Sequence, residues 1–253
     1  MGDRIKQVAL RVPGLLPLDF KLRGYRRMLS GNRELKLLKF LVNPEKTAVD
    51  VGANKGYFTF WLEKYAAHVH AYEPNPHNYF YLRGARGKVT LHQAALSDAA
   101  DSTTFRVRVF EEKRFWRRLL GGGGRLDHRG GSLHHQAIGE HFIEYPVEIR
   151  RLDDESPGAV GFLKIDVEGH ELSVLRGAKT LIATHRPVLL IEIEQRHNGA
   201  PTNQVIATVE ALGYRGIAIT RQGLQTAATL DPATYFDYAN RTDYVLDFIF
   251  LPA

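Results

Sequence analysis

The chain has 253 residues, of which 44% are hydrophobic and 25% are charged, and it contains no cysteine. This length and composition favour one folded α/β domain with extensions and exclude wholesale disorder. The lack of cysteine excludes disulfides, cysteine-ligated zinc and thiolate catalysis. No stretch approaches the roughly 18 uninterrupted apolar residues that a membrane-spanning helix needs. The basic N-terminus, interrupted by Pro13 and Pro17, is interpreted as mature sequence rather than a signal peptide, so we expect a cytoplasmic protein.

The formal charge of +6 is distributed unevenly along the chain. Residues 1–30 carry seven Lys or Arg against two Asp, and residues 113–118 form a second basic block. These blocks are either solvated surface, which is the simpler interpretation, or contacts near the substrate entrance for an acidic glycan, a lipid-linked sugar or a membrane surface. No helix-turn-helix, zinc-finger or RNA-recognition signature accompanies the charge, so nucleic acid is not the favoured partner. Peripheral membrane contact and the oligomeric state stay open.

Residues 1–45 predict short helices that form an N-terminal cap, because leucines recur at helical spacing from Leu35 to Leu41 before Asn43-Pro44 ends the run. Over residues 46–253, short apolar strands alternate with helices, a pattern typical of βαβ units in a parallel sheet. The expected helices cover residues 57–66, 77–84 and 168–179, and the expected strands cover 47–51, 68–72, 89–94, 147–152, 162–166, 187–193, 214–219 and 244–251. We therefore predict an α/β fold with about seven strands in one mostly parallel sheet, helices on both faces and an antiparallel pair of edge strands at the C-terminus.

This regularity fails between about residues 105 and 146. Four consecutive glycines, Gly121–Gly124, stand there with Gly130-Gly131 and a cluster of histidines that includes His134 and His135. Such a composition suits neither a core helix nor a central strand, so we predict a Gly/His/Arg-rich loop or insertion beside the sheet.

The first predicted strand ends in the run Asp50-Val51-Gly52-Ala53-Asn54-Lys55-Gly56. Two glycines four residues apart allow a sharp turn and close approach to a ligand, and the following helix begins with free N–H groups. The dinucleotide fingerprint is missing, because Asn54 occupies its middle glycine position and its last position, at or next to Phe58, is not glycine. Asp50 would repel a phosphate but suits a cationic ligand with an amino group, as in a sulfonium amino acid. This combination disfavours an NAD-dependent oxidoreductase.

Glu73 stands at the end of the second predicted strand, 23 residues after Asp50. A carboxylate at this position accepts hydrogen bonds from a ribose diol in nucleotide-binding folds. Residues 94–98 close the third strand, where an adenine ring would lie. Together with the glycine turn, these features favour S-adenosylmethionine over the alternative of a structural turn followed by a surface Glu-Pro pair.

Several runs resemble the FkbM family of class I methyltransferases. They are Asp-Val-Gly-Ala-Asn-Lys-Gly-Tyr-Phe-Thr from Asp50, Tyr-Glu-Pro-Asn-Pro from Tyr72, Ala-Leu-Ser-Asp from Ala95 and, most specific, Lys-Ile-Asp-Val-Glu-Gly-His-Glu from Lys164. The resemblance covers about residues 46–198 and implies a Rossmann-like class I fold that transfers methyl groups to hydroxyls, commonly on sugars or polyketides. It implies a cofactor role for Asp50, Gly52, Asn54, Gly56 and Glu73, and it puts Asp166 at the active-site end of a strand.

We accordingly expect an S-adenosylmethionine-dependent O-methyltransferase acting on a sugar, glycolipid or related small molecule. The expected cofactor-binding residues are Asp50, Gly52, Ala53, Asn54, Gly56, Tyr57, Phe58, Glu73, Pro74, Asn75, Ala95, Leu96 and Asp166. The expected catalytic residues are Asp166, His170 and Glu192. Asp166 or His170 deprotonates the acceptor while Glu192 orients it, unless His170 merely caps the next helix or pairs with Asp166.

A divalent metal is possible but not favoured. Asp166 and Glu192 could supply oxygen ligands, and the His134-His135 pair is a poorer candidate, yet a general base suffices for an activated methyl group. Two further functions stay open: an RNA methyltransferase, and a binding module without turnover. The sequence after Asp166 lacks the Asn-Pro-Pro-Tyr-type run of amino-methylating enzymes, which favours a hydroxyl acceptor.

Overall fold

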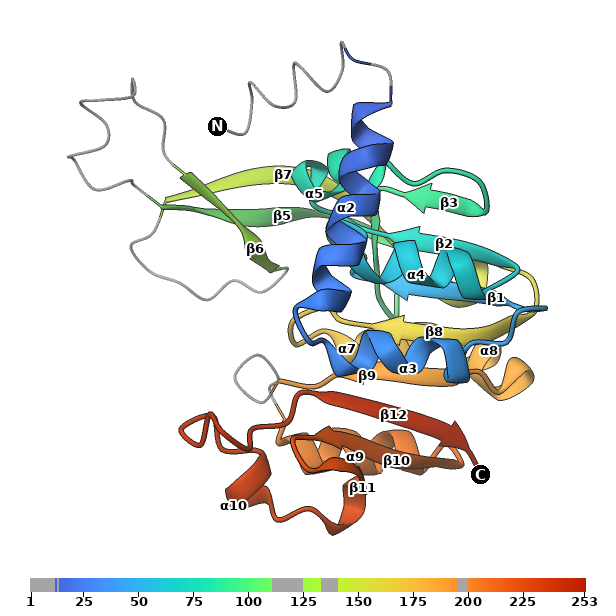
Figure 1. Ribbon diagram of the computed structural model, residues 1–253, viewed down its shortest axis with the longest axis vertical. Coiled ribbons are helices and arrows are strands. Elements are labelled where there is room, and N and C mark those ends of the chain that lie inside the picture. Colours follow the sequence, from blue (N-terminus) through green and yellow to red (C-terminus); the bar gives the residue numbers. More distant parts are fainter. Residues whose placement is uncertain (1–11, 13, 111–124, 133–140, 195–199) are drawn as a thin grey trace.

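The computed structural model describes residues 12, 14–110, 125–132, 141–194 and 200–253, which form two β-sheets with flanking helices (Figure 1). The larger sheet has eight strands in the order β11-β10-β12-β9-β8-β1-β2-β3, and the smaller has four in the order β4-β7-β5-β6. The strands of the larger sheet are β1 (Thr47–Val51), β2 (His68–Tyr72), β3 (Val89–His92), β8 (Val160–Ile165), β9 (Val188–Glu192), β10 (Tyr214–Thr220), β11 (Gly223–Thr226) and β12 (Asp247–Pro252).

The prediction of an α/β fold with a mostly parallel sheet is confirmed. Strands β3, β2, β1, β8 and β9 run parallel, and β12 and β10 are antiparallel to their neighbours. The strand count is eight rather than about seven, because the short polar strand β11 extends the sheet as a hairpin with β10. The predicted C-terminal pair is antiparallel as expected, but β12 lies inside the sheet between β9 and β10, so β11 forms the edge.

Alternating side chains of the strands supply two cores, one on each face of the larger sheet. Val49, Leu163 and Leu189 pack on one face, whereas the neighbouring residues Ala48 and Phe162 pack on the other. This alternation follows from the period of two in a β-strand, and burial on both faces is typical of parallel strands between helices. The helices on the first face are α7 (Glu171–Gly177), α8 (Lys179–His185) and α9 (Thr202–Glu210); those on the second are α2 (Leu15–Leu29), α3 (Arg33–Leu41), α4 (Tyr57–Tyr65) and α5 (Pro76–Leu82).

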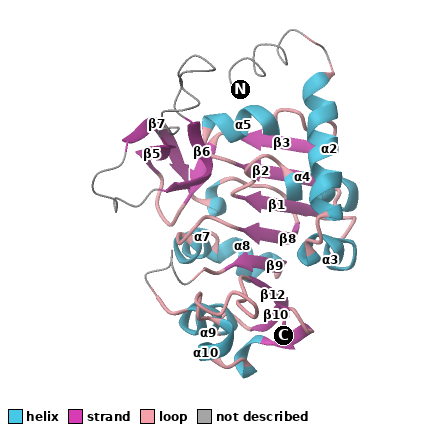
Figure 2. Ribbon diagram, turned by 60° about the vertical axis from the view of Figure 1, so that its left-hand side comes forward, coloured by secondary structure: helices cyan, strands magenta, loops and turns pink. Residues whose placement is uncertain are grey.

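The smaller sheet includes part of residues 105–146, for which we predicted a loop or insertion beside the main sheet. Strand β4 (Ala94–Leu96) pairs with β7 (His141–Arg150), and β7 pairs in turn with β5 (Asp101–Phe110), to which β6 (Arg125–Ser132) is added. Apolar and polar residues alternate over residues 103–109, a pattern typical of a β-strand. The nearby glycines and histidines obscured this pattern. Figure 2 shows this sheet beside the carboxyl ends of the parallel strands.

Several element boundaries also differ from the prediction; the strands expected at 147–152 and 244–251 are His141–Arg150 and Asp247–Pro252. The expected strand 89–94 is divided at Gln93 between the two sheets, since β3 pairs with β2 whereas β4 pairs with β7. The expected helix from Glu168 begins only at Glu171, because Glu168 (φ 49°) and Gly169 (φ 98°) adopt left-handed backbone conformations that a helix does not tolerate. Among the described residues, no helix is both long and apolar enough to cross a membrane.

Helix α2 packs on the outer side of α4 at a close backbone approach (Figure 1). A Cβ atom on Gly24 would lie 2.1 Å from Cδ1 of Phe60, and the Gly24 carbonyl accepts a hydrogen bond from the Trp61 indole N–H at 3.1 Å. The glycine therefore sets the distance between the two helices.

Substitution of Gly24 by alanine tests this contact. Alanine raises helix propensity by about 1 kcal/mol, but the added methyl group overpacks the Phe60 ring, at a cost of about 1–3 kcal/mol. We expect Gly24→Ala to lower the free energy of unfolding measured in urea, with the exposed Arg26→Ala as control. A more stable Gly24→Ala variant would show that the helices are not in close contact here.

Candidate active site

The turn after β1 is built from three residues with left-handed backbone conformations. Gly52 has φ 77°, Asn54 φ 52° and Gly56 φ 85°, which brings the chain back on itself before α4 begins. A Cβ atom on Gly52 would lie 1.8 Å from the backbone oxygen of Asp166, so only glycine fits. The Gly52 and Ala53 N–H groups both donate to the Tyr72 carbonyl at 3.0 Å, which fixes the turn against the end of β2.

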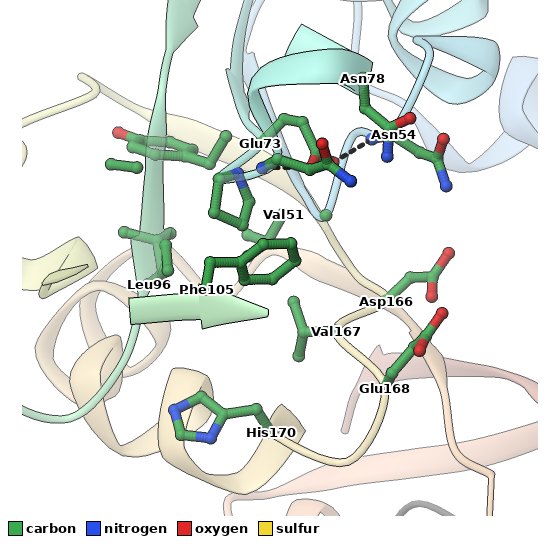
Figure 3. Close-up of a pocket in the computed structure, with 16 residues that line it drawn as sticks. Val51, Asn54, Glu73, Asn78, Leu96, Phe105, Asp166, Val167, Glu168 and His170 are labelled. Atoms are coloured by element: carbon green, nitrogen blue, oxygen red, sulfur yellow. Dashed lines mark hydrogen bonds between the residues drawn. The ribbon is translucent and has the colours of Figure 1, made fainter. Parts of the chain in front are cut away.

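Glu73 is buried at the end of β2 with both carboxylate oxygens already accepting hydrogen bonds. Oε2 accepts from the Asn54 N–H at 2.7 Å and Oε1 from the Asn75 N–H at 2.8 Å (Figure 3). Burial raises the pKa of Glu73 to about 7, although the hydrogen bonds from Asn75, Asn54 and Asn78 lower it. These three hydrogen bonds use three of the roughly four lone pairs of the carboxylate, and one lone pair is left for a ligand donor.

A narrow pocket of about 80 Å³ lies beside Glu73. Its apolar walls include Pro74, Leu96, Val167 and Phe105, and Figure 3 shows the Phe105 ring among these side chains. Phe105 belongs to β5 of the smaller sheet, so two sheets together form this pocket, which we call the donor pocket. A flat apolar ring beside a buried carboxylate matches what the adenosine part of a nucleoside ligand requires.

A larger cavity of about 560 Å³ lies at the carboxyl ends of β1, β8 and β9. We call it the acceptor cavity. Its charged lining contains the acids Glu34, Asp166, Glu192 and Asp247 and the cations Arg27, Arg33 and Lys164. Its apolar lining includes Tyr57, Phe58, Leu190, Ile219 and Leu246. Gly52, Asn54 and Asp166 line both cavities.

Lys164 is a buried cation beneath this acidic lining. Its ammonium group donates to Asp166 Oδ2 at 3.2 Å, lies 3.5 Å from Asp50 Oδ1 and stands 4.7 Å from the centre of the Phe58 ring. Burial lowers the pKa of Lys164, but the carboxylates of Asp166, Asp50 and Glu192 outweigh burial, so its pKa lies above the ordinary value. Lys164 therefore stays protonated at all physiological pH values.

Glu192 and Asp247 are direct partners across the β9–β12 pair. Burial, together with nearby carboxylates that include Asp166, raises the pKa of Glu192 to about 9. Burial and the carboxylates of Glu34 and Asp166 raise the pKa of Asp247 to about 8. Burial and the neighbouring carboxylates thus favour the proton-bound form of each carboxyl, in which it can donate a hydrogen bond.

The structure distributes the expected cofactor residues over both cavities. The donor pocket is lined by Gly52, Asn54, Glu73, Pro74, Asn75, Ala95, Leu96 and Asp166. The acceptor cavity is lined by Gly52, Ala53, Asn54, Tyr57, Phe58 and Asp166, and also by Glu192.

Asp50 and Gly56 line neither cavity. Asp50 was expected to face a ligand cation, but its carboxylate is fully buried behind the turn, where it accepts from the Thr59 hydroxyl at 2.6 Å and lies next to Lys164. Gly56 caps α4, and a Cβ atom there would lie 2.3 Å from the Phe20 ring and 2.8 Å from Leu82. Both residues thus help to set the conformation of the turn and do not themselves line a cavity.

His170 lies apart from the other two expected catalytic residues. It is the N-cap residue of α7 and lines the donor pocket, and its Nε2 is 2.8 Å from the Ser97 hydroxyl. Figure 3 shows the His170 and Asp166 side chains pointing in different directions. Asp166 and Glu192 share the acceptor cavity, which His170 does not line.

The sequence analysis missed Phe105, Asn78, Lys164, Glu34 and Asp247 as lining residues. Asp247 was detectable as an acidic residue that opens an apolar strand, and Lys164 as a charge inside one. Four features lie outside the described residues: the basic block 113–118, His134, His135 and His197. In the part of the chain that the structure describes, no three His, Asp or Glu side chains are grouped to hold a metal ion.

The strand order and the pocket at the carboxyl ends of β1 and β2 define a Rossmann-like α/β protein. The sequence model of the Methyltransferase FkbM domain family matches residues 50–215, more than half of the chain. The chain therefore belongs to the FkbM methyltransferase family.

Solved structures with similar folds include other methyltransferases. The methyltransferase FkbM from Methylobacillus flagellatus is 17% identical with a TM-score of 0.48, and the match covers 82% of this chain but only 44% of that one. A TehB-like SAM-dependent methyltransferase from Corynebacterium glutamicum is 10% identical with a TM-score of 0.43, covering 94% and 98% of the two chains. TYW2 from M. jannaschii, in complex with AdoMet, is 16% identical with a TM-score of 0.35, covering 87% and 75%. No curated protein sequence matches the chain.

The raised pKa values of Glu192 and Asp247 predict a pH-dependent stability. A carboxyl that holds its proton more tightly when folded stabilises the native state fully below its ordinary pKa, and this contribution is lost as pH rises through the folded value. We expect the free energy of unfolding to fall between about pH 5 and about pH 9, by about 1.4 kcal/mol per pH unit for each proton involved.

Urea titrations across this pH range test the assignment. Glu192→Gln and Asp247→Asn should each flatten the profile, whereas the exposed Glu45→Gln should not change it. An unaltered slope in both cavity variants would show that these carboxyls are ionised in the native protein.

Proposed function

We propose that the chain transfers a methyl group from S-adenosylmethionine to a hydroxyl oxygen of a sugar, glycolipid or related small molecule. The observation that carries this proposal is the shared boundary of the two cavities, since Asp166 lines both. A donor in one cavity and an acceptor in the other meet at this residue. Membership of a methyltransferase family supports the same reaction.

The donor pocket suits the adenosine part of S-adenosylmethionine. Glu73 offers a buried carboxylate for the ribose hydroxyls, and Pro74, Leu96 and Phe105 offer apolar surface for the purine. Backbone groups at Gly52 would hold the amino acid part near the junction of the cavities. When bound, S-adenosylmethionine supplies a methyl group already activated by its positive sulfur.

Asp166 is the best-placed proton acceptor in the acceptor cavity. Its carboxylate is partly exposed to the cavity and held by Lys164 at 3.2 Å, so it can take the proton that an acceptor hydroxyl loses as its oxygen receives the methyl group. His170 lies in the donor pocket beside Ser97, and we assign it a structural role there.

The acceptor cavity suits a molecule with several hydroxyl groups. The proton-bound forms of Glu192 and Asp247 would donate hydrogen bonds, Asp166 would accept them, and Tyr57 and Phe58 provide flat apolar surface. A sugar presents both hydroxyls and apolar ring faces to such a lining.

Calorimetry of the Glu73 variants tests the donor site. Glu73→Ala should weaken binding of S-adenosylmethionine by on the order of 1–3 kcal/mol, because the ribose hydrogen bonds are lost. Affinity of the unmodified protein should rise with pH through about 7, because ribose hydroxyls favour the ionised form of Glu73.

Glu45→Ala, an exposed glutamate at the opposite end of β1, is the matched control. The protein should show no affinity for NAD. Unchanged affinity in Glu73→Ala would remove Glu73 from the binding site.

Methyl transfer from labelled S-adenosylmethionine to a panel of glycans, lipid-linked sugars and RNA tests the acceptor and the base together. We expect labelled hydroxyls on a glycan or lipid-linked sugar. Asp166→Asn should cut turnover by on the order of a hundredfold with binding of S-adenosylmethionine nearly intact, whereas Asp154→Asn at an exposed site should not.

Three results would contradict this assignment. Label confined to RNA would exclude the sugar acceptor. Loss of S-adenosylmethionine binding in Asp166→Asn would make Asp166 a binding residue, and a hundredfold loss of turnover in His170→Ala alone would return the base to His170.

A further inference from the structure

Helix α2 carries an exposed apolar stripe. Leu18, Leu22 and Leu29 are 54%, 46% and 84% exposed, and Tyr25 is 48% exposed. At 3.6 residues per turn these four positions fall within about 60° of the helix circumference. The three leucines therefore form an exposed apolar stripe, and Tyr25 at its edge also packs against Phe60 and Trp61 of α4.

The opposite face of α2 is the one that packs on the protein. Phe20 and Gly24 are buried, and the Phe20 ring meets Phe60 of α4 at 5.6 Å between ring centres. A helix that already has a buried face gains nothing for its own folding from the exposed leucines. The exposed leucines are therefore not explained by the packing of the helix. Large contiguous apolar patches on a surface mark interaction sites.

Cations lie on both sides of this stripe. Lys21 and Arg26 are exposed and fall on opposite sides of it around the helix. Lys64 of α4 stands beside Tyr25, donating to its hydroxyl at 2.9 Å. Asp19, the acidic residue of α2, is neutralised by Arg23 at 2.7 Å. The face is consequently apolar along its centre and positive along its edges.

We propose that α2 is a membrane-contact helix that binds an anionic lipid surface. Leucines entering the boundary of the acyl chains, with flanking Lys and Arg on the headgroups, are the arrangement of an interfacial amphipathic helix. A two-fold contact between copies of the chain would instead bring Lys21 and Arg26 towards their own counterparts, which disfavours self-association.

The position of α2 gives this contact a consequence for the acceptor cavity. Arg27 in the last turn of α2, with Ser30 and Gly31 just after it, lines that cavity. A lipid surface held by α2 would therefore lie close to one wall of the cavity. The lipid contact itself does not depend on the reaction proposed above.

Co-sedimentation of the full chain with vesicles tests the proposal. We expect binding to vesicles of equal parts phosphatidylcholine and phosphatidylglycerol, much weaker binding to phosphatidylcholine alone, and loss of binding at high salt. Lys21→Gln and Arg26→Gln should each lower the partition coefficient about fivefold. The triple variant Leu18→Ser, Leu22→Ser, Leu29→Ser should lower it about tenfold or more for each leucine.

Leu212→Ser with Leu224→Ser is the matched control, because these leucines are also exposed but lie in the C-terminal part of the chain. Equal vesicle binding by the triple variant and this control would overturn the proposal. So would a dimer of the unmodified chain that the triple variant converts to a monomer, since a second copy would then cover the stripe.

A fluorescent label gives a second measurement, which reports the environment of one position and does not rely on comparing partition coefficients between variants. The chain has no cysteine, so Leu22→Cys and Leu224→Cys each carry a single environment-sensitive dye. Anionic vesicles should shift the emission of the dye at position 22 to the blue and leave the dye at position 224 unchanged. Equal shifts at both positions, or none at position 22, would also overturn the proposal.

Discussion

The site depends on the contacts that the buried ammonium group of Lys164 makes with two carboxylates. Lys164 lies on β8 between Asp50 of β1 and Asp166, which follows β8. A buried charge without a partner destabilises a protein by about 3–5 kcal/mol, so these side chains are tied to one another. The tie holds the ends of the two central strands in register, and it holds Asp166 at the junction of the two cavities. The turn at Gly52, which touches the Asp166 backbone, is fixed by the same arrangement.

Burial, rather than an excess of acids, dominates the ionisation of the acceptor cavity, because Arg27, Arg33 and Lys164 line it together with the carboxyls. Burial and neighbouring carboxylates raise the pKa values of Glu192 and Asp247. Lys164 opposes this rise at both groups, and Arg27 opposes it at Asp247. Asp166 differs from them in accepting a direct hydrogen bond from Lys164.

The sequence predicts those parts of the site that come from consecutive elements of the chain. Gly52 and Glu73 follow consecutive parallel strands, so the βαβ pattern alone brings them to one edge of the sheet. Asp247 could not be placed in this way, because its contact with Glu192 arises from the antiparallel insertion of β12 beside β9. Phe105 reaches the donor pocket from a second sheet that composition concealed. The Asp50 side chain is buried beside Lys164 of the neighbouring strand. The sequence pattern does not reveal this pairing, so it could not place Asp50 behind the turn.

The two cavities differ in how they relate to α2. Among the described residues that line the donor pocket, none belongs to α2, whereas Arg27 of its last turn lines the acceptor cavity. Arg27 also stands 5.8 Å from the centre of the Tyr57 ring, at the start of α4. Gly24 of α2 packs against Phe60 of α4, and Phe20 of α2 packs against Gly56 of the turn after β1. Helix α2 is therefore in contact with the turn that borders both cavities, and it supplies a wall only to the acceptor cavity.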